Sequence, residues 1–97
     1  MVLEHALLPV VPGREADFEA ALAEALPILR SMPGCRRATV SRCVEEPSRY
    51  LLLVEWQRIE DHDPGFRGSM AYQRWRELLH PFYDPFPVVQ HFEDVGS

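Results

Sequence analysis

One run of residues limits the folds open to this chain more than any other feature. Residues 50–56 read YLLLVEW, the most apolar stretch of the sequence. Alternate residues of a β-strand face opposite sides of a sheet, so Leu52 and Val54 are expected on one face and Leu51 and Leu53 on the other. Because both faces are apolar, we expect this strand to lie in the middle of a sheet that is covered on both sides.

The rest of the sequence predicts three further strands and two helices. Apolar residues at spacings of three and four indicate a first helix over residues 14–30, and Pro33-Gly34 ends it. Ser69 can cap a second helix that continues to His80. A short helical turn and loop is predicted for residues 59–68. The predicted strands span residues 2–10, 35–44, 50–56 and 86–95.

The order of these elements is β-α-β-β-α-β, which predicts a ferredoxin-like α+β fold with a four-stranded antiparallel sheet. In this topology the first and third strands are central, and two helices cover one face. The other face needs cover from outside the chain, and a second copy packed sheet against sheet is the simplest supplier. We therefore expect residues 1–97 to form a single domain that assembles as a homodimer through the sheet face.

The composition argues against several classes of partner. A formal net charge of −5 gives no electrostatic reason to bind nucleic acid or an anionic membrane surface. No stretch approaches the ~18 apolar residues of a membrane span, and the first residues do not resemble a signal peptide, so a cytoplasmic protein is expected. Neither Cys35 nor Cys43 has a second ligand at the short spacing of zinc sites, so we expect no metal site.

The sequence resembles a known family over essentially its whole length. Residues 53–62 read LVEWQRIEDH, and they are followed by Phe66, by Ser69 and by YQRW at residues 72–75. A strand ending in tryptophan, a short acidic helix with a histidine, an aromatic-x-x-serine step and a second helix resemble the antibiotic biosynthesis monooxygenase family. The turn at residues 33–35 fits it as well. The resemblance implies a dimeric α+β barrel with a pocket between helices and sheet in each subunit.

The resemblance also implies a type of reaction. Members of that family include oxygenases that act on hydroquinones and polycyclic phenols without metal or flavin, and relatives that degrade haem. Haem-degrading relatives carry asparagine, tryptophan and histidine where this chain has His5, Phe66 and Arg76, so haem degradation is disfavoured. We expect a monooxygenase without a cofactor that uses O2 on a small phenolic, quinol or polycyclic aromatic substrate. The alternative is a non-catalytic binding or scaffold protein of the same fold.

Such an oxygenase needs a base, hydrogen-bond donors and a dry pocket, because an aromatic anion can reduce O2 itself. His62 and His91 are the candidate catalytic bases, since an unperturbed histidine pKa near ~6.5 suits proton removal at neutral pH. A surface position for His62 and a structural or dimer contact for His91 are the alternatives. His5 is expected beside His91. The candidate substrate-binding residues, of which the aromatic ones are equally typical of a plain core, are Tyr72, Trp75, Phe66, Trp56 and His5.

Overall fold

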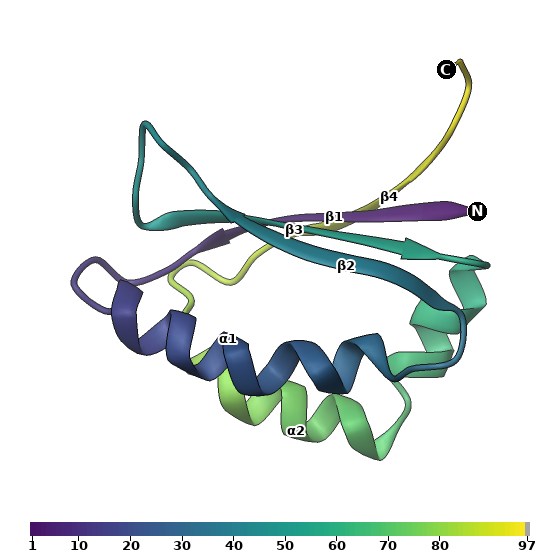
Figure 1. Ribbon diagram of the computed structural model, residues 1–97, viewed down its shortest axis with the longest axis horizontal. Helices are drawn as coiled ribbons and strands as arrows, with labels where there is room; N and C mark the ends of the chain where they lie inside the picture. The colour runs from purple at the N-terminus through teal and green to yellow at the C-terminus, as the bar shows by residue number, and fades with distance from the viewer. Residues whose placement is uncertain (97) are drawn as a thin grey trace.

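The chain forms a ferredoxin-like α+β fold, which the computed structural model describes for residues 1–96. The predicted order of strands and helices is confirmed. The elements are β1 (Val2–Pro9), α1 (Glu15–Arg30), β2 (Cys35–Arg42), β3 (Arg49–Trp56), η1 (Asp61–Phe66), α2 (Met70–Leu79), η2 (His80–Phe82) and β4 (Val89–Glu93). Figure 1 shows the sheet as one layer and α1 and α2 side by side as the other.

The sheet has the strand order β2-β3-β1-β4, and every neighbouring pair is antiparallel. The two most apolar strands, β1 and β3, are therefore central, as predicted. They pair along their whole length, from Val2 opposite Trp56 to Pro9 opposite Arg49. The last strand, β4, lies at the edge and pairs only with β1. Residues from the two ends of the chain are thus neighbours in the sheet.

The core lies between the sheet and the helices. On β3, the side chains of Tyr50, Leu52, Val54 and Trp56 are buried, whereas the residues between them are partly exposed. This alternation places the buried set on the side that faces the helices. The helices contribute buried side chains that pack against this set, namely Phe18, Ala25 and Leu29 from α1 and Trp75 and Leu79 from α2.

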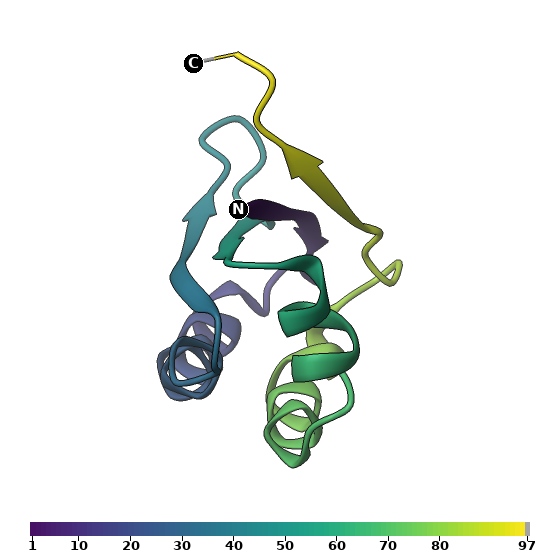
Figure 2. The same ribbon diagram turned by 90° about the vertical axis from the view of Figure 1, so that its right-hand side faces the viewer.

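The opposite side of the sheet is called the outer face below. Figure 2 shows both helices on the other side of the sheet, so neither covers this face. Leu7 is 45% exposed and Phe92 is 48% exposed there. The strand registers place these side chains on the outer face: Leu3, His5, Leu7, Thr39, Ser41, Leu51, Leu53, Gln90 and Phe92, together with the facing charged pair Arg37 and Glu55.

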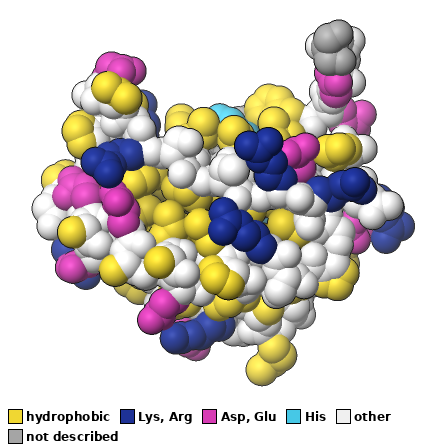
Figure 3. Space-filling view, in the orientation of Figure 1, with side chains coloured by type: hydrophobic (Ala, Val, Ile, Leu, Met, Phe, Trp, Pro, Cys, Tyr) yellow, Lys and Arg dark blue, Asp and Glu magenta, His cyan; other side chains and the backbone are white. Residues whose placement is uncertain are grey.

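A shallow apolar hollow lies on another surface, between β2 and α1 (Figure 3). Leu22, Leu26 and Val40 line it. At its edge, the Tyr50 hydroxyl donates a 2.6 Å hydrogen bond to Glu19, which also pairs with an arginine of β2. The Tyr50 hydroxyl is therefore already paired with a protein group.

The largest difference from the sequence-based expectation concerns the last strand. It begins at Val89 rather than at residue 86. Pro85 and Pro87 have no N–H group to donate to a neighbouring strand, so the chain joins the sheet only after them. The preceding segment instead brings Phe86 to the space between sheet and helices. No helix within residues 1–96 has the length and apolar character needed to cross a bilayer.

Candidate active site

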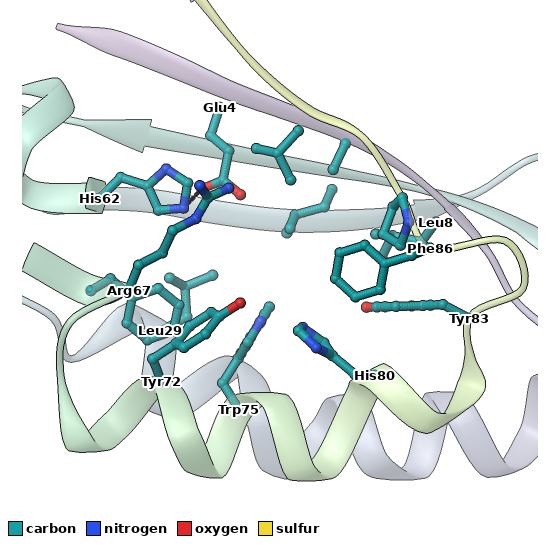
Figure 4. Close-up of a pocket in the computed structure, with 15 residues that line it drawn as sticks. Glu4, Leu8, Leu29, His62, Arg67, Tyr72, Trp75, His80, Tyr83 and Phe86 are labelled. Atoms are coloured by element: carbon teal, nitrogen blue, oxygen red, sulfur yellow. Dashed lines mark ion pairs between the residues drawn. The ribbon is translucent and has the colours of Figure 1, made fainter. Parts of the chain in front are cut away.

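A cavity of about 60 Å³ lies between the sheet and α2 (Figure 4). Glu4, His62 and Arg67 lie at one end, and Tyr83 and Phe86 lie at the other. Tyr72 and Trp75 line it from α2 without filling the space beneath them. Apolar side chains of the sheet form the opposite wall: Ala6, Leu8, Leu52 and Val89.

Glu4 is the unexpected member of this group. It occupies a core-facing position of β1, in phase with Ala6 and Leu8, and is only 5% exposed. Its Oε1 atom accepts a 2.9 Å hydrogen bond from the indole N–H of Trp56, the last residue of β3. Burial raises the pKa of Glu4 and outweighs the opposing effects of that hydrogen bond and of Arg67. A carboxylate held in this way is a stronger base than one in water.

His62 lies against Glu4 on the short η1 segment and is 3% exposed. Its ring stacks on the indole of Trp56, with 5.3 Å between centroids and 16° between planes. Its Nε2 atom is 3.4 Å from Oε1 of Glu4, and its Nδ1 atom is 2.7 Å from Nε2 of His91. Residues from β1, η1 and β4 therefore form a continuous polar group, called the Glu4–His62–His91 chain below.

The protonation states of this chain follow from its surroundings. Burial, the Arg67 guanidinium and His91 lower the pKa of His62 to about 4. Burial and Arg67 also lower the pKa of His91. Both imidazoles are therefore neutral at neutral pH. With Glu4 ionised, one arrangement satisfies both contacts: His91 donates to Nδ1 of His62, and Nε2 of His62 carries a proton toward Glu4. If the direction of both contacts is reversed, His62 donates to His91 and Glu4 carries the proton that faces His62. The Glu4–His62–His91 chain can therefore move a proton between Glu4 and the partly exposed His91.

Aromatic side chains form much of the rest of the site. Phe66 is buried and meets the ring of Tyr72 edge-on at 5.2 Å and that of Trp75 at 5.8 Å. Ser69 fixes the start of α2, because its hydroxyl oxygen accepts a 3.2 Å hydrogen bond from the backbone N–H of Tyr72. The cap therefore sets where α2 begins and presents both of its aromatic side chains to the cavity.

The structure brings most of the predicted site residues together. His62, Phe66, Tyr72 and Trp75 line the cavity, and Trp56 and His91 contact His62 from outside the lining. His5 is separate from them, because it lies on the outer face, where its ring contacts Phe92 at 5.6 Å. The expectation that His5 adjoins His91 is wrong. In the β1–β4 register His91 is opposite Glu4, and His5 is opposite Gln90.

Sequence reasoning missed Glu4, Arg67 and Tyr83. A signal for Glu4 was present, because a carboxylate in phase with Ala6 and Leu8 on a central strand must be buried. Arg67 and Tyr83 lie in loop segments for which no periodicity predicts a direction. Among residues 1–96, no group of three or more histidine, cysteine or acidic side chains is placed to hold a metal ion.

Comparison with known proteins gives the family. A family model described as antibiotic biosynthesis monooxygenase matches residues 1–78. The chain belongs to the antibiotic biosynthesis monooxygenase family. Glu4, His62 and Trp75 lie within the residues that match the family model, and Tyr83 and His91 follow them.

Individual relatives cover nearly the whole chain of this monooxygenase-family protein. The uncharacterized protein YczJ of Bacillus subtilis (strain 168) is 53% identical over 95 residues, which are 98% of this chain and 100% of YczJ. A crystal structure from Bordetella bronchiseptica, assigned to the antibiotic biosynthesis monooxygenases, is 39% identical with a TM-score of 0.91, covering 98% of this chain and 97% of that one.

A third similarity concerns the fold alone. A variant of SnoaB from Streptomyces nogalater, described as a cofactor-independent oxygenase, superposes with a TM-score of 0.85. The alignment covers 99% of this chain and 94% of SnoaB, and the sequences are 17% identical. At this identity the similarity shows a shared fold, and the description as an oxygenase applies to SnoaB.

Proposed function

We propose that this chain is a cofactor-independent monooxygenase that uses O2 to oxidise a small phenolic, quinol or polycyclic aromatic substrate. The observation that carries the proposal is the buried Glu4–His62–His91 chain at one end of a cavity walled by aromatic side chains. Membership of the monooxygenase family supports it. The printed description of SnoaB as a cofactor-independent oxygenase is consistent with it.

Proton removal is the step that these residues can perform. In the proposed reaction Glu4 takes the proton of the phenolic hydroxyl, and its raised pKa makes that transfer more favourable. His62 and His91 carry the proton toward solvent. The guanidinium of Arg67, at the same end of the cavity, stabilises the phenolate electrostatically (Figure 4).

The phenolate then supplies all the electrons that O2 requires. The overall reaction converts a phenol and O2 into a quinone and water. In a phenol, a ring C–H bond is replaced by a C=O bond, so one oxygen atom of O2 becomes bonded to a ring carbon and the other leaves as water. In a hydroquinone, a ring C–H becomes C–OH, both original hydroxyl carbons become C=O, and the second oxygen atom again leaves as water. The substrate is oxidised and O2 is reduced, so the proposed reaction needs no further reductant.

Access to the site depends on the segment before β4. A cavity of about 60 Å³ is smaller than the roughly 150 Å³ that holds benzene in an apolar protein interior. Phe86 lines the cavity and is 61% exposed, so its side chain has room to turn outward. In the proposed reaction this movement admits the ring, and single-ring substrates need the smallest displacement.

Oxygen uptake tests the proposal. The purified chain, with a chelator and no added flavin, is given a panel of phenols, hydroquinones and polycyclic phenols. Glu4→Gln, His62→Ala and His91→Ala should each lower the stimulated uptake, with the Glu4 variant losing about 100-fold, because a positioned base contributes that order of rate. Glu77→Gln makes the same chemical change on the exposed side of α2 and should not alter uptake. No stimulated uptake on any substrate would favour the non-catalytic alternative.

We also propose that the chain is one domain and forms a homodimer in the cytoplasm. Support for the dimer comes from the partly exposed leucines and Phe92 of the outer face, which a second copy would bury. Two sheets packed in this way give the dimeric α+β barrel. Cys35 and Cys43 are both free thiols, as is usual in a reducing compartment.

A further inference from the structure

The cavity has hydrogen-bond donors that no protein group uses, and Tyr83 carries the one at the end away from Glu4. Within residues 1–96, the Tyr50 hydroxyl and the Trp56 indole are paired with glutamates. The corresponding groups of Tyr72, Trp75 and Tyr83 have no such partner, and none of them is sealed off from open space. Figure 4 shows the Tyr83 hydroxyl pointing into the cavity.

The ring of Tyr83 is fixed from several sides. It packs against Phe18 at 6.1 Å and against His80 at 5.8 Å, two contacts that remain when Phe86 turns outward. Its backbone is bridged to Val10 at the end of β1. Burial raises the pKa of Tyr83, and the negative charge of Glu4 adds to this effect, so the Tyr83 hydroxyl keeps its proton and can donate. A donor with a fixed position is what selective recognition of an oxygen atom requires.

Tyr83 and Glu4 approach the cavity from opposite ends. Val10, beside Tyr83, is six residues from Glu4 along the chain, which corresponds to ~20 Å of extended strand. Both side chains point inward and shorten that separation (Figure 4). An aromatic ring between them would meet a base at one edge and a hydroxyl donor at the other.

We propose that Tyr83 is a specificity-determining residue that donates a hydrogen bond to a second oxygen atom of the substrate, across the ring from the hydroxyl that Glu4 deprotonates. The site then prefers rings with oxygens in para positions, such as hydroquinone. Phenol would leave the Tyr83 hydroxyl unpaired, and catechol carries both oxygens at one end. This inference rests on the proposed function and names its substrate class. Tyr83 lies outside the residues that match the family model.

Binding measured without turnover tests the inference separately from catalysis. Hydroquinone, phenol and catechol are titrated under argon into the isotope-labelled chain, and dissociation constants are obtained from NMR shifts. The wild-type chain should bind hydroquinone about fivefold more tightly than phenol or catechol, as expected for one hydrogen bond to a neutral donor. Tyr83→Phe should remove that preference and leave phenol binding unchanged. Tyr50→Phe removes a hydroxyl that faces Glu19 and should keep the preference.

The outcomes separate the two proposals. A hydroquinone preference that Tyr83→Phe abolishes supports the inference even if no oxygen uptake is found, in which case only the proposed function fails. Equal affinities for the three ligands, or a preference that survives Tyr83→Phe, overturn the inference even in an active oxygenase. Failure of all three ligands to bind overturns it as well.

Discussion

His62 is buried, whereas the other three histidines are partly exposed. It is 3% exposed, lies flat on the indole of Trp56, and has a polar neighbour at each ring nitrogen. Glu4, His91, Arg67 and Asp63 are the charged or titratable groups that act on it. Because desolvation is the largest of these influences, the neutral imidazole is favoured over the charged one.

This environment predicts an unusual titration. The pKa of His62 is lowered to about 4 in the folded chain, whereas an unfolded histidine titrates near ~6.5. Nitrogen NMR of the ring should therefore show a neutral His62 at pH 5.5, with His62→Gln identifying the signal. A ring that titrates at or above the unfolded value would contradict the burial described above.

The same shift has a consequence for stability. Between about pH 6.5 and about pH 4, the unfolded chain binds a proton at His62 that the folded chain does not, so the contribution of His62 to stability is lost as the pH falls. Glu4 acts in the opposite direction, because its pKa is raised. Denaturant unfolding at pH 7 and pH 5 should thus show a smaller loss of stability in His62→Gln than in the wild-type chain.

Residue types indicated part of the site, and contacts supplied the rest. His62 and His91 were candidates because of their chemistry, but 29 residues separate them in the sequence, and only the sheet register brings them within 2.7 Å. In the sequence, Glu4 lies within the strand predicted over residues 2–10, and no neighbouring residue indicates a role for it. Its role depends on the indole and imidazole that surround it, and these come from segments more than 50 residues away.

The turn between α1 and β2 fixes the position of the segment that carries His62. Gly34 has φ +84° there, and its carbonyl accepts a 2.8 Å hydrogen bond from Gln57. The side chain of Asp61 packs directly over the Gly34 Cα and accepts a 3.1 Å hydrogen bond from the backbone N–H of Arg58. A loop distant in sequence therefore fixes the start of η1.

Replacing this glycine should be more harmful than its conformation alone explains. In Gly34→Ala the new methyl group would meet the Asp61 side chain, and the left-handed backbone adds strain. Gly13→Ala is the matched control, because Gly13 has φ +93° with open space around it. Denaturant unfolding should show a loss of about 1 kcal/mol for Gly13→Ala and about 2 kcal/mol or more for Gly34→Ala. Equal losses would mean that Asp61 moves aside at no cost.

The elements themselves were largely predictable, because their signals are local. The apolar runs of β1 and β3 gave both the strands and their central positions, and Ser69 marked the start of α2. The start of β4 was not predictable to the same degree. Phe86 and Val88 have strand-like character, but Pro85 and Pro87 interrupt pairing, and what Phe86 contacts instead is a matter of tertiary structure.

At the scale of the whole molecule, the two sides of the sheet have different roles. The helix-facing side holds the cavity, and the outer face carries partly exposed apolar residues with no helix over them. The dimer proposed for the outer face would leave the cavity mouth at Phe86 untouched, since that residue lines the helix-facing side. A variant that prevents the proposed assembly should therefore leave the cavity intact.

A single unpaired charge in the centre of the outer face should prevent that assembly, because the charged residues already there, Arg37 and Glu55, lie opposite each other. Leu53→Asp places a carboxylate in the centre of the face, on β3, and should convert a dimer into a monomer in analytical ultracentrifugation. Val44→Asp is the control, because Val44 is 88% exposed in the turn after β2. The Val44→Asp variant should remain a dimer. A wild-type monomer, or a dimeric Leu53→Asp variant, would rule out the outer face as the interface.

The pairing of β4 with β1 has one more consequence, which concerns biosynthesis. His91 follows Glu4 by 87 residues, so Glu4 is synthesised well before it, and in the sheet formed by residues 1–96 β4 pairs with β1 alone. Before β4 has been synthesised, the chain can form the hairpin of β2 and β3 and can place His62 beside Glu4. It still lacks His91, so the proton path from Glu4 through His62 does not reach the protein surface. In the proposed oxygenase, the proton route from Glu4 is therefore complete only after β4 has been synthesised and has paired with β1.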